Sequence, residues 1–106
     1  MALTSTQLSI APVSIFTSSG SNAITAVYLC NSGTQAVNFT IYAVPNGGSA
    51  SALNAIYYSV PLTVNDTYII DTEKIILENG DALFANLNLA SGGAVRVVAT
   101  VSSIEV

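Results

Sequence analysis

Apolar and polar residues alternate with a period of two along most of this chain, which is the pattern of strands with one buried face. In the segment 37–43, which shows it most clearly, the apolar positions are Val37, Phe39, Ile41 and Ala43. Extended segments are also predicted at 7–17 (interrupted by Pro12), 23–30, 55–62, 74–77, 82–85 and 94–104. The sequence therefore predicts an all-β domain, a single antiparallel β-sandwich of jelly-roll or Ig-like kind with about seven or eight short strands.

The phase of the alternation predicts which side chains face the core. Three further core faces are expected, formed by Ile24, Ala26, Tyr28 and Cys30, by Ile56, Tyr58, Val60 and Leu62, and by Val95, Val97, Ala99 and Val101. Cys30 is thus expected to be a small buried core residue rather than a nucleophile. Pro61 places its strand near a sheet edge or a strand end, because proline cannot donate to the hydrogen-bond ladder.

Turn residues separate these segments. Residues 31–34, with sequence NSGT, predict a hairpin between 23–30 and 37–43, and Asn79-Gly80 predicts a type I′ hairpin between 74–77 and 82–85. Residues 91–93 predict another turn, residues 71–74 a short helical turn or a corner, and residues 45–54 a loop. We expect residues 1–21 to be an N-terminal extended arm or a first strand, and residues 22–106 to be the β-sandwich domain.

The charge distribution is unusual. Only 8% of the residues are charged, against roughly 25% in an ordinary soluble domain, and no charged residue precedes Asp66. Interface cores are depleted of charge, so this favours a surface covered by partner proteins over a merely polar one. Lys74 and Arg96 are the only basic residues, too few to bind nucleic acid. Polar residues interrupt every apolar run, and no secretion signal is recognised, so neither a membrane helix nor export is expected.

The inventory of reactive side chains argues against catalysis. The chain has no histidine and one cysteine, which excludes a Ser-His-Asp triad and a zinc cluster, and no cofactor is expected. Five acids fall within the range 66–81: Asp66, Asp71, Glu73, Glu78 and Asp81. Their spacing does not match a calcium loop, and we interpret them as turn residues. The protein is therefore expected not to be an enzyme.

Tyrosine is the residue type that most favours an interface function, because it joins a large apolar area to a polar tip. The candidate protein-interface residues are Tyr28, Tyr42, Tyr57, Tyr58, Tyr68 and Arg96. Tyr57 and Tyr58 are adjacent in an extended segment, so one is expected to face the core and the other solvent. An exposed tyrosine here, together with the acids near Asp71, leaves a carbohydrate-binding module as an alternative.

Three runs between Asn54 and Asp81 carry a resemblance to a known class: IYYSVPL at 56–62, NDTY at 65–68 and KIILENGD at 74–81. Together with the valine-rich last strand, they resemble small virion structural proteins of tailed bacteriophages. The resemblance covers about residues 22–106 and implies a β-sandwich that joins parts of the virus particle. It brings no catalytic residue with it.

The expected function is accordingly that of a capsid cement or decoration protein, which stabilises the phage head by bridging capsid subunits. Its partners would be the major capsid protein or other virion proteins, and it would be located in the virion. A homo-oligomer is expected, with a trimer favoured at a local three-fold axis. A neck, tail or baseplate component is the alternative within the same particle.

Overall fold

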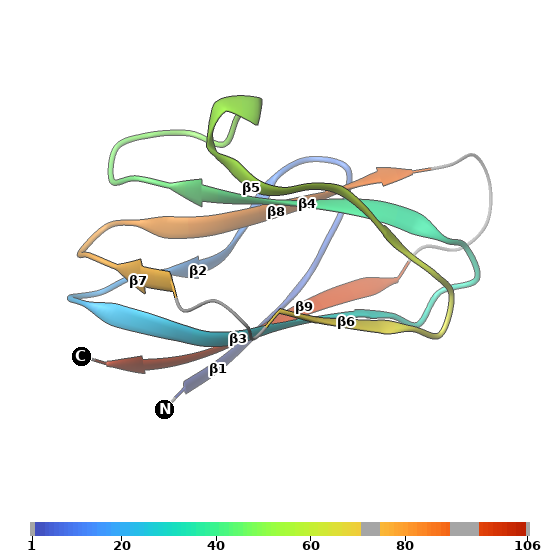
Figure 1. Ribbon diagram of the computed structural model, residues 1–106, viewed down its shortest axis with the longest axis horizontal. Helices are drawn as coiled ribbons and strands as arrows, with labels where there is room; N and C mark the ends of the chain where they lie inside the picture. Colours follow the sequence, from blue (N-terminus) through green and yellow to red (C-terminus); the bar gives the residue numbers. More distant parts are fainter. Residues whose placement is uncertain (1, 71–74, 90–95, 106) are drawn as a thin grey trace.

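The computed structural model describes residues 2–70, 75–89 and 96–105, which form two antiparallel sheets packed face to face (Figure 1). Sheet A has the order β1 (Ala2–Gln7), β9 (Val97–Glu105), β3 (Asn22–Asn31) and β6 (Thr67–Ile70), with β7 (Ile75–Leu77) also paired to β3. Sheet B has the order β2 (Val13–Thr17), β8 (Ala82–Leu89), β4 (Val37–Val44) and β5 (Ala55–Leu62). A single 3₁₀ turn, Ala52–Asn54, precedes β5. The predicted all-β antiparallel sandwich is confirmed.

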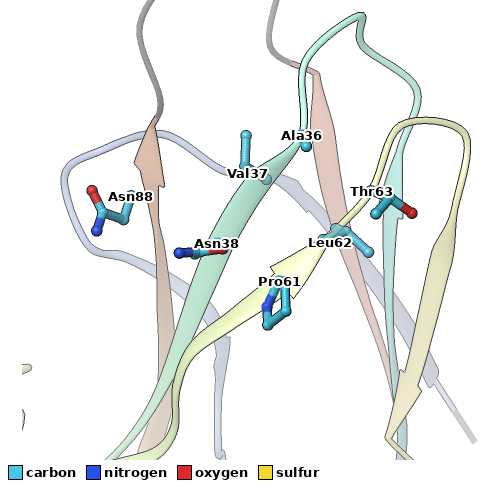
Figure 2. Close-up of a pocket in the computed structure, with 7 residues that line it drawn as sticks. All are labelled: Ala36, Val37, Asn38, Pro61, Leu62, Thr63 and Asn88. Atoms are coloured by element: carbon cyan, nitrogen blue, oxygen red, sulfur yellow. The ribbon is translucent and has the colours of Figure 1, made fainter.

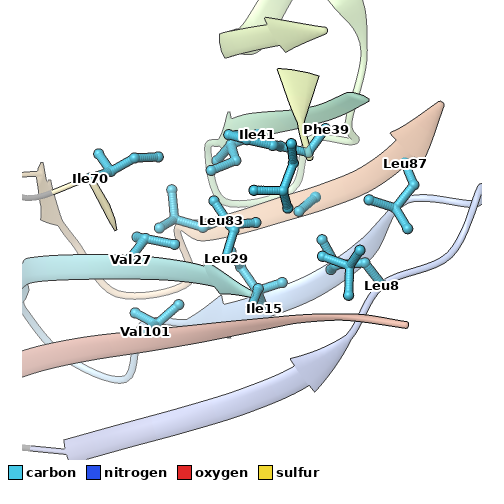
Figure 3. Close-up of a cluster of buried hydrophobic side chains, with 14 of the residues drawn as sticks. Leu8, Ile15, Val27, Leu29, Phe39, Ile41, Ile70, Leu83, Leu87 and Val101 are labelled. Atoms are coloured by element: carbon cyan, nitrogen blue, oxygen red, sulfur yellow. The ribbon is translucent and has the colours of Figure 1, made fainter. Parts of the chain in front are cut away.

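The core lies between the sheets and is made of the inward-facing side chains of both (Figure 3). Phe39, Leu29 and Leu83 have no exposed surface, and Ile41 has 1%. The inward face predicted for 37–43 is therefore confirmed, although Thr40 and Tyr42 on the opposite face are buried too, and the shared buried face of Val97, Ala99 and Val101 is confirmed. Val95, predicted on the same face, lies outside the described residues, as does the predicted turn at 91–93.

Residues 1–21 contain two strands rather than one. β1 pairs with β9 in sheet A, from Ala2 opposite Ser103 to Gln7 opposite Val98. β2 pairs with β8 in sheet B, and Ile15 inserts into the core with 1% exposure. The segment thus contributes one strand to each sheet, and β6, which lies outside the predicted segments, is the other addition that gives the described chain nine strands where the sequence predicts about seven or eight.

Both predicted hairpins are wrong, because each turn joins one sheet to the other. The segment after β3 leads to β4 in sheet B, and residues 78–81 lead from β7 in sheet A to β8 in sheet B. The second turn has its hydrogen bond from the Asp81 N–H to the Glu78 carbonyl at 3.0 Å. In it Gly80 has φ of 88° while Asn79 is not left-handed, which matches a type II turn and not type I′. The hairpin-forming twist of type I′ is therefore lacking.

β-bulges interrupt the alternation in β3 and β5, so the inward face predicted for each strand is right on one side of the bulge and wrong on the other. The register of β3 against β9 shifts between Ile24 and Ala26, so Val27 and Leu29 turn inward and Cys30 turns outward. Cys30 is exposed, and the predicted core position is wrong. In β5 a shift near Ser59, whose φ is 50°, separates Tyr58, which is 68% exposed against the prediction, from Val60 and Leu62, which face the core as predicted. A bulge inserts one residue and so moves every later side chain to the opposite face.

The turn at Gly80 supports a stability prediction. A Cβ at Gly80 would clash with the Asn46 side chain, and its φ of 88° disfavours any other residue. We expect Gly80→Ala to lower the free energy of unfolding by about 2–3 kcal/mol, measured by urea denaturation. Gly47→Ala is the matched control, because Gly47 has φ of 83° but open space around it, and it should lose only about 1 kcal/mol. Equal losses in the two variants would contradict the contact with Asn46.

Candidate protein-binding surface

The outer face of sheet A is the candidate site, and the strand register determines which residues it contains. Tyr28 on β3 lies beside Thr100 on β9 and Ile69 on β6, and Thr100 lies beside Ser5 on β1. Alternate residues of each strand share this face. The set, called the A face below, consists of Leu3, Ser5, Gln7, Ala23, Ala26, Tyr28, Cys30, Thr67, Ile69, Ile76, Val98, Thr100, Ser102 and Ile104.

Large apolar side chains of the A face are exposed to solvent. Leu3 is 69% exposed, Ile76 60% and Ile69 51%, and Tyr28 and Ile104 are also exposed. The small residues between them, such as Ala23 and Ser102, are buried at the base of the face. An exposed apolar patch of this kind, spread over neighbouring strands, is a typical feature of a protein-interaction site.

None of the A-face residues is charged, and the charges of the described chain lie at strand ends or in connections. Asp66, Glu78, Asp81 and Arg96 lie outside the strands, and Glu105 is the last residue of β9. A surface that binds another protein through its centre is depleted of charge in this way, because burying an unpaired charge is costly. The charged side chains of the described chain thus lie at the ends of the sandwich and not on its two outer sheet faces.

Two of the turn acids have structural partners. The Asp66 carboxylate accepts hydrogen bonds from the Thr67 N–H at 2.9 Å and the Thr63 hydroxyl at 3.2 Å, which confirms its predicted turn role. The Asp81 carboxylate accepts from the N–H groups of Asn46 at 2.9 Å and Glu78 at 3.1 Å. Asp71 and Glu73 lie outside the described residues. Within the described ranges, no three acidic or cysteine side chains gather closely enough to hold a metal ion.

The outer face of sheet B differs in chemistry, because its amides and hydroxyls bond to one another and to the backbone. The Tyr42 hydroxyl donates to Asn86 Oδ1 at 3.1 Å, and Asn86 Nδ2 donates to the Ile10 carbonyl at 3.0 Å. Asn38 pairs with Asn88 across β4 and β8. The β4–β8 part of this face is therefore polar, while β5 exposes Ile56 (44%) and Tyr58 (68%), fewer large apolar side chains than the A face exposes.

The predicted interface residues are not brought together. Tyr28 lies on the A face, whereas Tyr42 lies in sheet B and is 8% exposed. Tyr68 turns toward the core and packs edge-to-face on Phe39, with ring centroids 5.3 Å apart. Tyr57 packs against the core and Tyr58 is exposed, which confirms the prediction that they face opposite ways. Arg96 is exposed in the connection before β9 and is not a member of the A face.

The aliphatic part of the A face is not predicted from the sequence; it consists of Leu3, Ile69, Ile76 and Ile104. A signal for two of them is present, because Ile69-Ile70 and Ile75-Ile76-Leu77 are apolar without alternation. Such runs are typical of strands with both faces covered. The inner neighbours Ile70 and Leu77 are buried in the core, while Ile69 and Ile76 point outward with nothing over them in the described chain.

Three hollows open on the described part of the chain, and one of about 300 Å³ is lined by apolar residues together with Asp81. Another, of about 240 Å³, lies at the β4–β5 side of sheet B, where Asn38, Pro61 and Asn88 line it together with neighbouring residues (Figure 2). Its lining holds no titratable side chain. The third, of about 280 Å³, is lined by Ile56, Tyr57, Ala43, Ile70 and Ile75. None of the three linings provides both the acid and the base that a proton-transfer reaction needs.

Comparison with known proteins found no matching family model, no similar curated protein and no similar solved structure. The residues described by the structure include no helix that is long and apolar enough to cross a membrane.

Proposed function

We propose that the protein is a structural subunit of a tailed-phage virion, a cement or decoration protein that binds the major capsid protein through the A face. The observation that carries the proposal is the combination of exposed Leu3, Ile69 and Ile76 with the absence of charge across the A face. Covering such a face with apolar surface of a partner is favourable, and no unpaired charge is buried in the process. The resemblance of the segment 54–81 to phage virion proteins supports a capsid protein as the partner.

The mechanism is burial, not chemistry. A decoration protein stabilises a shell when its contacts with adjacent capsid subunits add free energy that is lost if the subunits separate. The A face suits this role because its strands are tied to a closely packed core, so little conformational entropy is lost when it docks. Tyr28, near the middle of the face, offers a large ring with a polar tip, the residue type enriched at binding hot spots.

The copy number of the protein in purified particles tests this proposal. Particles from the source culture are purified on a density gradient, and the chain is quantified by mass spectrometry relative to the major capsid protein. Hundreds of copies per particle are expected for a decoration protein. A few copies would instead support the neck, tail or baseplate alternative, and absence from the particles would overturn the virion function.

The carbohydrate-binding alternative depends on one exposed aromatic ring. Tyr58 is exposed on β5, but Tyr57 packs against the core, and Asp71 lies outside the described residues. A sugar site generally needs polar groups converging beside the ring. A glycan array that returned a specific hit, abolished by Tyr58→Ala, would favour this alternative over the virion function.

A further inference from the structure

The free edge of β1 differs from the other sheet edges in the described chain. β2 and β5 carry β-bulges, β5 also contains Pro61, and β6 and β7 are four and three residues long. Bulges, proline and short length are devices that prevent an edge from pairing with another strand. β1 has six residues in unbroken register with β9 and contains no proline and no charge. It is therefore an edge open to a further strand.

Alternation of the hydrogen bonds identifies the peptide groups at this edge. The Leu8 N–H donates to the carbonyl of Val97, directly opposite, at 2.9 Å. In an antiparallel pair, hydrogen-bonded and non-hydrogen-bonded positions alternate, so Thr6 and Thr4 bond to β9 as well. The N–H and C=O groups of Leu3, Ser5 and Gln7 then point away from β9 toward the open edge. Consistent with this, the Ser5 and Thr100 hydroxyls approach to 3.0 Å, as expected at a non-hydrogen-bonded position.

We propose that two copies of the protein pair through this edge, β1 against β1 in antiparallel orientation, about a two-fold axis at Ser5. In this register Ser5 faces Ser5 of the second copy, and Leu3 faces Gln7 in both directions. Each facing pair exchanges both of its hydrogen bonds, which gives about six across the junction. The residues facing the core side pair Thr4 with Thr6, and Thr–Thr pairs are favourable across antiparallel strands.

The size of the A face supports a second copy of this chain as the partner of the β1 edge. Four strand positions about 4.8 Å apart and roughly 25 Å of strand length give a face of roughly 450 Å². A stable protein interface buries about 800 Å² on each partner. The two-fold axis is perpendicular to the sheet, so both A faces lie on one side and together present roughly 900 Å². The dimer thus supplies the area that the proposed capsid contact needs.

Charge favours the same pairing. The net charge of each chain is −4, which opposes association in general. β1 contains no acidic residue. Its partner strand β9 has one, Glu105, which is the last residue of that strand. Self-pairing through β1 therefore brings together two uncharged strands. An isologous contact of this kind closes with two copies, because each β1 edge is then occupied by the other.

Sedimentation equilibrium of the full chain in solution tests the pairing. The unaltered protein is expected at twice its 10.9 kDa mass. Ser5→Pro is expected to sediment at the mass of one chain with unchanged far-ultraviolet circular dichroism, because the Ser5 N–H is not used by β9 and a proline is tolerated at such an edge. Ser5→Ala, which keeps the N–H, should remain dimeric. A monomeric or trimeric unaltered protein, or a dimeric and folded Ser5→Pro variant, would overturn the proposal.

Charge exchange at the same position tests the register. Ser5→Lys alone and Ser5→Glu alone are each expected to be monomeric, because the two-fold axis brings two like charges together. An equimolar mixture should restore the dimer at low salt, and high salt should reduce the difference between the mixture and the single variants, because it screens attraction and repulsion alike. If the mixture stays monomeric, residue 5 does not face itself, and the proposed register is wrong.

The area argument rests on the proposed function, but the pairing itself does not. Sedimentation is carried out with no virus particle present. A monomeric unaltered protein would therefore contradict the dimer and leave the proposed function untouched. A dimer that is confirmed in solution but absent from purified particles would leave the β1 contact in place and remove the virion function.

Discussion

Asn31→Asp is expected to lower the free energy of unfolding by about 3–5 kcal/mol at neutral pH. Asn31 has no exposed surface and sits where β3 ends. Its Nδ2 donates to the carbonyls of Gln35 at 2.9 Å and Leu62 at 3.3 Å, and its Oδ1 accepts from the Gly33 N–H at 3.1 Å. One amide therefore ties the sheet-to-sheet connection to the end of β5. A carboxylate at this site would face two carbonyl oxygens with no proton to donate.

The loss at Asn31 is expected to depend on pH. Burial beside carbonyl oxygens raises the pKa of the introduced carboxyl, so the folded state binds a proton more tightly than the unfolded state. The destabilisation is therefore full at high pH and shrinks as the pH falls through that raised pKa. Urea denaturation at several pH values measures it. Asn88→Asp, at an exposed position on β8, is the control and should change stability by less than about 0.5 kcal/mol.

The strands of this fold are predictable from the sequence because each is short and half buried. The segment 37–43 is an example. Its strand, β4, pairs with β8 in unbroken register, so Phe39 and Ile41, two residues apart, both face the core. The absence of charge before Asp66 is interpreted as a surface covered by partner proteins, which stays a prediction. These features are local, and local pattern is what a single sequence records.

The faces and connections were less predictable, because they depend on long-range pairing. An Asn-Gly turn is compatible with a hairpin and with a link between sheets, and only the partners of β7 and β8 decide between them. The bulge before Ala26 has no marker in the sequence, yet it reverses the face of Cys30. The A face was missed for the same reason. Its members come from five strands that are distant in sequence and meet only in the folded sheet.

Ile69→Lys is expected to have the largest effect on binding. Ile69 lies beside Tyr28 on the A face and is half exposed, so a lysine there is tolerated in the free protein. In the complex the ammonium group would be buried against apolar surface without a partner. We expect the affinity for virus particles to fall by about 100-fold, which corresponds to about 2.7 kcal/mol. The fold itself should be unaffected, because the side chain points away from the core.

Asn88→Lys is the matched control, since it places the same charge on the exposed outer face of sheet B. It should bind particles within about threefold of the unaltered protein, because rim and non-interface charges contribute little. Thermal denaturation of both variants checks that neither has lost its fold.

The most direct measurement is co-sedimentation of these proteins with particles purified from the source culture and stripped of the chain. The account predicts that the unaltered protein and Asn88→Lys pellet with the particles, while Ile69→Lys stays in the supernatant. Equal binding by the two variants, or no binding by the unaltered protein, would contradict the claim that the A face joins this protein to the virion.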